Sequence, residues 1–290
     1  MTALQRDVDR FVQDFRKTSS PAAERRVADA AVDRLIGRYA TKDLAKVVTN
    51  MPFEGGSLLH LATCAGASTA TIDRLLRIVP ITRTSKVGFT PLMTATMYRH
   101  LHLVKLLLKR GAKPNVRGYL GRTALHHAAE NGESKIAAEL IRAGASVSLR
   151  DEFGYTPLHL AAAEMFEHRN LDVLRVLLVG GANPNARDGK GTTPARIVFG
   201  RRGDLHERAG RLMRKYGAKQ SKDDRNDRND RNDRNDRNDE RRRRRTRSTR
   251  STRSTRKTRN DDDGSAAGVI GGMAGMVGLV GTVAGLSLVV

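Results

Sequence analysis

The stretch GYTPLHLAA at residues 154–162 decides the fold, because the chain repeats it. Related words begin at Gly88 (GFTPLMTA), Gly121 (GRTALHHAA) and Gly191 (GTTPARIV), and a weaker copy, GGSLLHLA, begins at Gly55. These starting glycines are spaced by 33, 33, 33 and 37 residues along the chain. A recurring period of this length is typical of a fold built from stacked repeats.

One unit of the repeat has the signals of two short helices. Thr156 suits the N-cap of the first helix, and Pro157 suits its first turn, where the missing N–H has no partner to lose. The second helix, LDVLRVLL at residues 171–178, is stopped by Gly180-Gly181, since glycine adopts a left-handed C-cap most easily. Two short helices cannot enclose a core alone, so neighbouring units must stack into a solenoid.

These words resemble the ankyrin repeat family over residues 55–219, and three copies match T-P/A-L-H-x-A-A closely. The resemblance implies an all-α repeat fold, an ankyrin-repeat solenoid whose helix-turn-helix units are joined by β-turn or hairpin loops. The expected repeats are 55–87, 88–120, 121–153, 154–190 and 191–219.

Residues 1–54 are expected to form an N-terminal helical cap. Leu4, Val8, Phe11 and Phe15 follow a helical period and predict an amphipathic helix over 3–16. Its apolar stripe is expected to pack on the rest of the cap; the alternative is contact with a partner or a membrane surface.

The composition favours acidic partners. The 290 residues include 53 Lys or Arg against 31 Asp or Glu, a net charge of +22. Residues 220–263 hold 17 of the basic and 11 of the acidic residues. Residues 1–219 therefore hold 36 basic and 20 acidic residues, a net charge of +16, because residues 264–290 hold none of either. The single cysteine, Cys64, excludes an intramolecular disulfide and is expected to be a small helix residue. The charged first ten residues do not resemble a secretory signal.

No catalytic motif accompanies the histidines. His60, His126 and His159 occupy one position of the repeat, where the resemblance implies hydrogen bonds that lock neighbouring turns. No zinc-protease word, nucleophile elbow or phosphate-binding glycine loop occurs. The sequence therefore predicts a non-enzyme with no cofactor and no metal.

The resemblance implies partner contacts beside each turn glycine and at the end of each first helix. The predicted partner-binding residues are Lys86, Phe89, Tyr98, Tyr119, Leu120, Arg122, Glu152, Phe153 and Tyr155, with Val87, Met97, Glu130, Asn131, Ala163 and Glu164 at the same repeat positions. Five of the twelve aromatic residues of the chain lie in this set, and aromatic side chains dominate protein-binding hot spots. The alternative for Phe89 and Tyr155 is packing along their own turn, and Met165 and Phe166 extend the surface if their loop is exposed.

Residues 220–263 predict a disordered low-complexity charged linker, because no apolar residue interrupts its R-N-D and R-S-T repeats. Its basic run is Arg241, Arg242, Arg243, Arg244, Arg245, Arg247, Arg250, Arg253 and Arg256. This run could bind anionic lipid, bind nucleic acid or act as an import signal, or serve only as a soluble tether.

Residues 264–290 carry no charge, and their length suits one membrane-spanning helix. The spacing of Gly268, Gly271, Gly272 and Gly275 allows two such helices to pack closely. The alternative is a soluble glycine-rich tail. The basic residues just before this segment place the repeats on the cytosolic face, which describes a tail-anchored protein.

The sequence therefore predicts a non-enzymatic ankyrin-repeat scaffold, anchored in a membrane, that binds a protein partner through its concave face. The alternative is a soluble nuclear or nucleic-acid-associated ankyrin regulator that uses the arginine run for import or binding.

Overall fold

The structure is a computed structural model that describes residues 2–18, 20–47, 55–165, 171–200 and 203–219. The chain divides into two compact units, Met1–Asn232 and Asp233–Val290, and all of the described residues belong to the first. The predicted linker, 220–263, and the predicted membrane segment, 264–290, lie outside the described residues.

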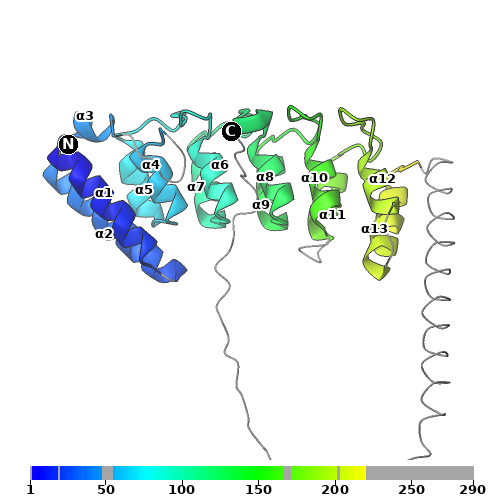
Figure 1. The fold of residues 1–290 in the computed structure, drawn as a ribbon, viewed down its shortest axis with the longest axis horizontal. Coiled ribbons are helices and arrows are strands. Elements are labelled where there is room, and N and C mark those ends of the chain that lie inside the picture. The colour runs from blue at the N-terminus through cyan, green and yellow to red at the C-terminus, as the bar shows by residue number, and fades with distance from the viewer. Residues whose placement is uncertain (1, 19, 48–54, 166–170, 201–202, 220–290) are drawn as a thin grey trace, which may run out of the picture. The chain divides into compact units, whose positions relative to one another are not determined.

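The described residues form paired helices that follow one another in a row (Figure 1). The row begins with α1 (Ala3–Arg16), α2 (Pro21–Arg38) and α3 (Thr41–Leu44). The repeat pairs are α4 (Leu58–Cys64) with α5 (Thr69–Leu76), α6 (Pro91–Met97) with α7 (Leu101–Lys109), α8 (Ala124–Glu130) with α9 (Ser134–Arg142), α10 (Pro157–Glu164) with α11 (Asp172–Val179), and α12 (Pro194–Phe199) with α13 (Asp204–Lys215).

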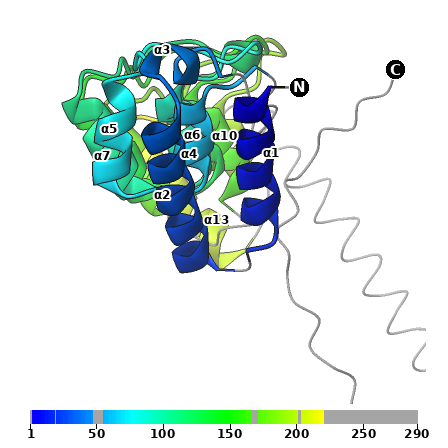
Figure 2. The ribbon, with the colours of Figure 1, turned by 90° about the vertical axis from the view of Figure 1, so that its left-hand side faces the viewer.

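The first and second helices of the repeats form two layers. Each first helix packs on the first helix of the next repeat, and the second helices do the same; Figure 2, viewed along the row, shows α4, α6 and α10 in one layer and α5 and α7 in the other. This arrangement confirms an all-helical ankyrin-repeat stack.

The helix signals of the sequence are confirmed at the ends of the repeat helices. Thr156 is the N-cap of α10 and Pro157 is its first residue. Gly144, after α9, and Gly181, after α11, have φ values of 86° and 89°, in the left-handed region that a side chain disfavours.

Small and branched residues alternate in the core of the stack. Ala62, Ala95 and Ala128, one in each of three successive first helices, have no exposed surface, and small side chains at buried positions allow helices to approach closely. Leu107 and Leu140 of the second helices are also fully buried. Each repeat thus covers the core of the next, as a solenoid requires.

Helix α1 packs on α2, so the prediction that its apolar stripe faces the cap is confirmed. Val8 and Phe11 are buried. The hydroxyl of Tyr39 donates a hydrogen bond of 2.8 Å to Asp7, and Arg38 forms an ion pair with the same carboxylate at 3.0 Å. These polar contacts fix the pairing of the two helices at one end.

The loops between repeats contain turns rather than extended hairpins, and the described residues form no strand. In the loop before α10 the amide of Asp151 donates to the carbonyl of Tyr155 (2.9 Å), and Gly154 donates to Asp151 (3.0 Å). Of the two loop forms expected, the structure has the β-turn.

Across the part of the chain that the structure describes, none of the helices has the length and apolar character that a membrane span requires.

Candidate protein-binding surface

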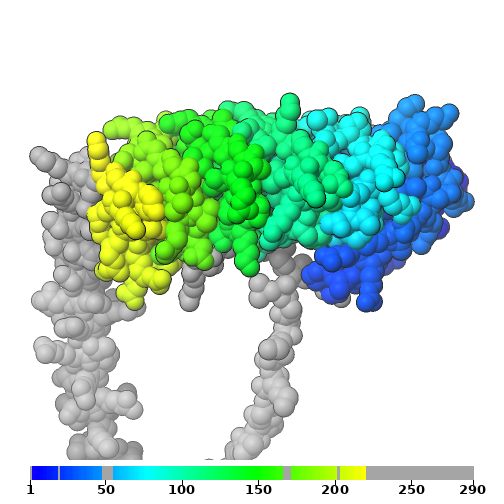
Figure 3. Space-filling view, turned by 180° about the vertical axis from the view of Figure 1, so that it is seen from behind, coloured from blue at the N-terminus to red at the C-terminus, as the bar shows by residue number. Residues whose placement is uncertain are grey.

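Four loops point the same way along one edge of the stack, and we call residues 82–89, 115–122, 148–155 and 185–192 the finger row. The loops form the upper edge of the molecule in Figure 1, and the space-filling view from behind shows successive repeats in contact beneath them (Figure 3).

Exposed apolar side chains concentrate on the finger row. Among the described residues, the large hydrophobic side chains classed as exposed are Val87 (36%), Tyr98 (37%), Tyr119 (40%), Phe153 (52%) and Val179 (68%). Three of these five lie in the finger row, and Tyr98 caps the end of α6. Clustered exposed apolar groups mark an interaction site, whereas a single one, such as Val179 on α11, needs no explanation.

Backbone hydrogen bonds connect neighbouring fingers. The amide of Glu152 donates to the carbonyl of Leu120, and the amide of Gly189 donates to that of Phe153, both at 2.9 Å. Leu120 has a φ of 56°, in the left-handed region that costs a leucine about 1 kcal/mol. The bond from Glu152 holds this strained carbonyl in place, so the fingers form a continuous, preorganised edge.

Phe89 supports Tyr119 from below. Its ring lies 6.4 Å from that of Tyr119 and 5.6 Å from that of His127, and it is only 6% exposed. Phe89 therefore lacks the exposure expected of a partner contact. Its ring packs against the next finger and α8 rather than along its own turn, which was the alternative expected.

Aromatic rings also form a series of contacts between the finger at 148–155 and helix α10. The ring of Phe153 lies 6.2 Å from that of Tyr155, which lies 5.8 Å from that of His159 on α10. Tyr155 is half-buried in this series, while Phe153 remains at the tip. Phe153 thus has the predicted exposure, and Tyr155 has it only in part.

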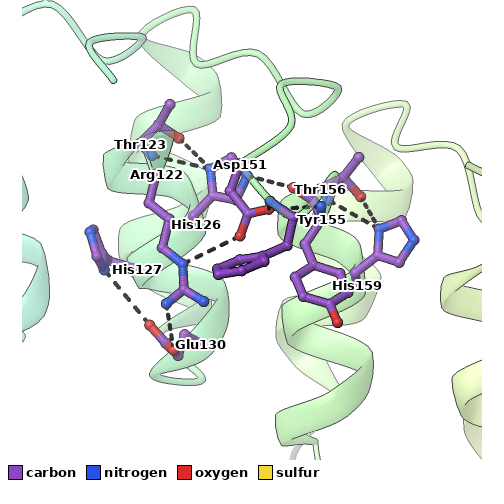
Figure 4. A network of polar contacts seen from close by, with 10 residues as sticks. Arg122, Thr123, His126, His127, Glu130, Asp151, Tyr155, Thr156 and His159 are labelled. Atoms are coloured by element: carbon purple, nitrogen blue, oxygen red, sulfur yellow. Dashed lines mark hydrogen bonds and ion pairs between the residues drawn. The ribbon is translucent and has the colours of Figure 1, made fainter. Parts of the chain in front are cut away.

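A polar cluster beneath the fingers holds Arg122 (Figure 4). The guanidinium of Arg122 lies 2.8 Å from Glu130 and 3.4 Å from Asp151. Burial raises the pKa of Glu130, but its hydrogen bond with His127 and the charge of Arg122 lower it by more, so Glu130 titrates below its ordinary range. Arg122 is therefore committed mainly to contacts within the stack.

Asp151 is the residue that shapes the finger at its centre, and sequence reasoning missed it. Its fully buried carboxylate accepts hydrogen bonds from the amides of Phe153 (3.0 Å) and Tyr155 (2.8 Å). Asp188 repeats this pattern in the next finger with the amides of Lys190 and Thr192. The signal was an aspartate three residues before the turn glycine, a position that favours such turns.

Three capping histidines, His60, His126 and His159, attach the first helices α4, α8 and α10 to the next finger. Nδ1 of His126 accepts from the amide of Thr123 (3.2 Å), and its Nε2 donates to the carbonyl of Tyr155 (3.1 Å). Equivalent bonds join His60 to Phe89 (2.9 Å) and His159 to Thr192 (3.2 Å). The implied locking role is therefore confirmed.

Burial keeps these histidines neutral. It lowers the pKa of His60 and of His126 to about 4, more than the hydrogen bonds to backbone carbonyls raise it. A neutral ring with the proton on Nε2 is the form that can accept at Nδ1 and donate at Nε2.

Other predicted residues have mixed outcomes. Tyr98 is exposed, but its hydroxyl is hydrogen-bonded to the Cys64 thiol. Cys64 is buried, which raises its pKa to about 12, so it is the expected structural helix residue. Met165 is 2% exposed, so the condition under which it would extend the surface is not met, and Phe166 lies outside the described residues.

Lys86, Leu120 and Glu152 lie at the finger tips, as predicted. The amide of Asn131 is used within the stack, since it donates to the carbonyl of Met97 at 3.2 Å. In the described part of the chain, no group of three or more His, Cys, Asp or Glu side chains could hold a metal ion.

The family model described as "Ankyrin repeats (3 copies)" matches residues 22–118 and 116–188. The chain belongs to the ankyrin repeat family. The match begins at α2, so it extends into the region expected to be a cap and gives that region the character of a repeat.

Three relatives are similar over short stretches. The B-cell lymphoma 3 protein homolog of Mus musculus is 36% identical over 93 residues, which are 32% of this ankyrin-repeat chain and 21% of the relative. The probable E3 ubiquitin-protein ligase XBOS33 of Oryza sativa subsp. japonica is 44% identical over 52 residues, 18% of this chain and 10% of that protein. An ankyrin and IPT/TIG repeat-containing protein of Schizosaccharomyces pombe is 39% identical over 68 residues, which are 23% of this chain and 6% of that protein. The chain thus spans about a fifth or less of the relatives it matches.

Proposed function

We propose that this ankyrin-repeat protein is a non-enzymatic scaffold that binds a protein partner through the finger row and the adjoining ends of the first helices. The observation that carries the proposal is the gathering of exposed apolar side chains there: Val87, Tyr98, Tyr119 and Phe153. The ligase named among the relatives matches over only 10% of its length, and we transfer no activity from it.

The rigidity of the finger row supports this proposal. Binding costs less entropy when the contact residues are already ordered. Here backbone hydrogen bonds join Leu120 to Glu152 and Phe153 to Gly189. The aromatic side chains of Tyr119 and Phe153 have only two rotatable bonds each, so they offer large contact areas at a small entropic cost.

The experiment compares three forms of the full chain as bait in cell extracts: the wild type, Tyr119→Ala/Phe153→Ala and Val179→Ala. Val179 is the matched control, because it is the most exposed large hydrophobic residue of those that the structure describes and lies on α11, away from the fingers. We expect the double variant alone to lose specific partners. Equal partner sets for all three forms, with unchanged folding by circular dichroism, would contradict the proposal.

We also propose attachment to a membrane through residues 264–290, with the repeats on the cytosolic face. The support is the sequence alone: 27 uncharged residues preceded by the basic run 241–259. Carbonate extraction of cell membranes tests it. Recovery of the protein in the soluble or nuclear fraction would favour the alternative, in which the arginine run serves import or binds nucleic acid; binding of the same run to anionic lipid would favour the membrane.

A further inference from the structure

The exposed charges of the finger row are nearly all positive. Within its four loops the exposed charged residues are Arg83, Lys86, Arg117, Arg150, Arg187 and Lys190 against the single acid Glu152. The other two carboxylates of the row, those of Asp151 and Asp188, accept backbone hydrogen bonds in their own turns. The edge therefore carries six exposed cationic side chains and one exposed anionic side chain.

The second helices, which also carry many basic residues, provide a contrast. There two of the cations meet acids of neighbouring repeats: Arg110 lies 2.6 Å from Asp73, and Lys105 lies 3.5 Å from Glu139. Among the residues that the structure describes, Arg83, Arg117 and Arg187 have no ion pair. Part of the positive charge on the second helices is thus paired with acids of neighbouring repeats, whereas these three arginines of the finger row are not.

The cations recur in register with the apolar tips. Arg117, Arg150 and Arg187 each stand four residues before the finger glycine, at positions 121, 154 and 191. Between them lie the exposed side chains of Tyr119 and Phe153. Arg150 also donates hydrogen bonds to the carbonyl of Gly154 (3.2 Å) and to that of Arg187, which fixes its guanidinium between two fingers. A partner that follows the row therefore meets basic and apolar groups in turn.

We propose that the finger row binds an acidic segment of a partner protein in which carboxylates are interspersed with aromatic or aliphatic side chains. The inference rests on the proposed function and names its partner class. Carboxylates of the segment pair with the arginines, and its apolar side chains cover Val87, Tyr119 and Phe153. The exposed aliphatic side chain of Val87 favours a protein over a nucleic acid, because phosphates use the cations and bases stack on aromatic rings, whereas an aliphatic group is covered by apolar side chains.

The test is a selection of random displayed peptides of about 16 residues, which reach about 50 Å when extended, on the full chain. Bound peptides are then assayed against three variants: the charge variant Arg117→Glu/Arg187→Glu, the apolar variant Tyr119→Ala/Phe153→Ala, and the control Lys135→Glu/Arg175→Glu. The control changes the net charge by the same amount on the exposed faces of α9 and α11. Because every form keeps the arginine run at 241–259, only differences between forms are compared.

We expect finger-dependent peptides, those weakened by the apolar variant, to be acidic and rich in aromatic or aliphatic residues. The charge variant should weaken them by about tenfold or more, and the control by less than about twofold, because exposed distant charges are screened. Photo-crosslinking of a bound peptide to Arg117 or Arg187, rather than to residues 241–259, would support the same site.

Each other outcome overturns the inference. If finger-dependent peptides are neutral or basic, the partner class is wrong while the proposed function stands. If no selected peptide depends on the fingers, the proposed function fails as well. If the control variant weakens peptide binding as much as the charge variant does, the peptides are attracted by the net charge of the protein and not by the finger arginines. If single-stranded oligonucleotides bind in a finger-dependent manner and acidic peptides do not, the surface binds nucleic acid instead.

Discussion

His126 offers the sharpest test of how the stack holds its fingers. Its ring connects the start of α8 to the finger at 148–155 through Thr123 on one side and the carbonyl of Tyr155 on the other. The change His126→Leu replaces the polar ring with an apolar side chain of similar size and removes the hydrogen bonds of the ring. It leaves the buried amide of Thr123 without this partner, while the carbonyl of Tyr155 keeps its hydrogen bond from the amide of Asp151.

The cost follows from these two groups. The buried amide that loses its partner costs about 1–3 kcal/mol and the hydrogen bond lost at the carbonyl about 1 kcal/mol, so His126→Leu should destabilise the protein by about 2–4 kcal/mol at neutral pH. The wild type should, in addition, lose stability in acid, because the folded state keeps His126 neutral down to a pKa of about 4. Unfolded chains protonate histidine near pH 6.5, so below that pH the unfolded state binds more protons and stability falls with pH.

Leucine does not titrate, so the gap between wild type and His126→Leu should narrow as the pH falls. Between pH 7.5 and pH 5.5 the narrowing should be about 1.4 kcal/mol, and it should level off near pH 4. Urea unfolding of both full-length proteins, followed by far-ultraviolet circular dichroism at several pH values, measures it. His60→Leu serves as a second instance, because the pKa of His60 is also about 4. A gap that stays constant with pH would refute the neutral, doubly bonded histidine.

Three further predictions concern other parts of the chain. Gly144→Val should lower stability by about 1–2 kcal/mol in thermal melts, because the left-handed φ of Gly144 disfavours any side chain. A steric clash is not the cause, since no atom lies within 4 Å of the added Cβ. The control Gly37→Ala, inside α2 and with equal space around it, should not lower stability. Asp151→Ala should cost about 2–4 kcal/mol, because its carboxylate holds two amides, and Asp151→Asn should cost less. A melt that ranks these two aspartate variants in the opposite order would contradict the turn. Met276→Arg should release the protein from carbonate-washed membranes, since a central arginine costs about 2.5–3.5 kcal/mol on insertion; retention in the pellet would argue against insertion.

Local features of the repeat were predictable from the sequence. The N-cap at Thr156, the first-turn proline at 157 and the left-handed glycine at 144 each depend on the residue itself and its immediate neighbours. The equal spacing of the copies then predicted the stack, because one unit cannot bury its own apolar face.

Features that depend on the neighbouring repeat were not predictable in the same way. Phe89 and Tyr119 occupy similar places beside a turn glycine, yet one is buried and the other exposed, because the finger of the following repeat lies over Phe89. The burial of Met165 also depends on tertiary packing rather than on its neighbours in the sequence.

The internal role of Arg122 was also hidden in the sequence. Its guanidinium lies beside Glu130, eight residues away, and Asp151, 29 residues away. The resemblance implied a partner contact, whereas the geometry shows a link between the fingers at 115–122 and 148–155. By contrast Arg117 and Arg187, with the same charge, have no acid beside them, and only the structure separates the two cases.

The affinity of a partner or peptide selected only for binding to the wild-type chain, measured for three forms of the full chain, tests the central claim most directly. Calorimetry should show that Tyr119→Ala/Phe153→Ala weakens binding by about 30-fold or more, or about 2 kcal/mol, as expected for two exposed aromatic anchors. Val179→Ala, which removes an even more exposed apolar side chain from α11, should leave the dissociation constant within about twofold of the wild type. Unchanged affinity in the folded double variant, or an equal loss in Val179→Ala, would contradict the assignment of the finger row as the binding surface.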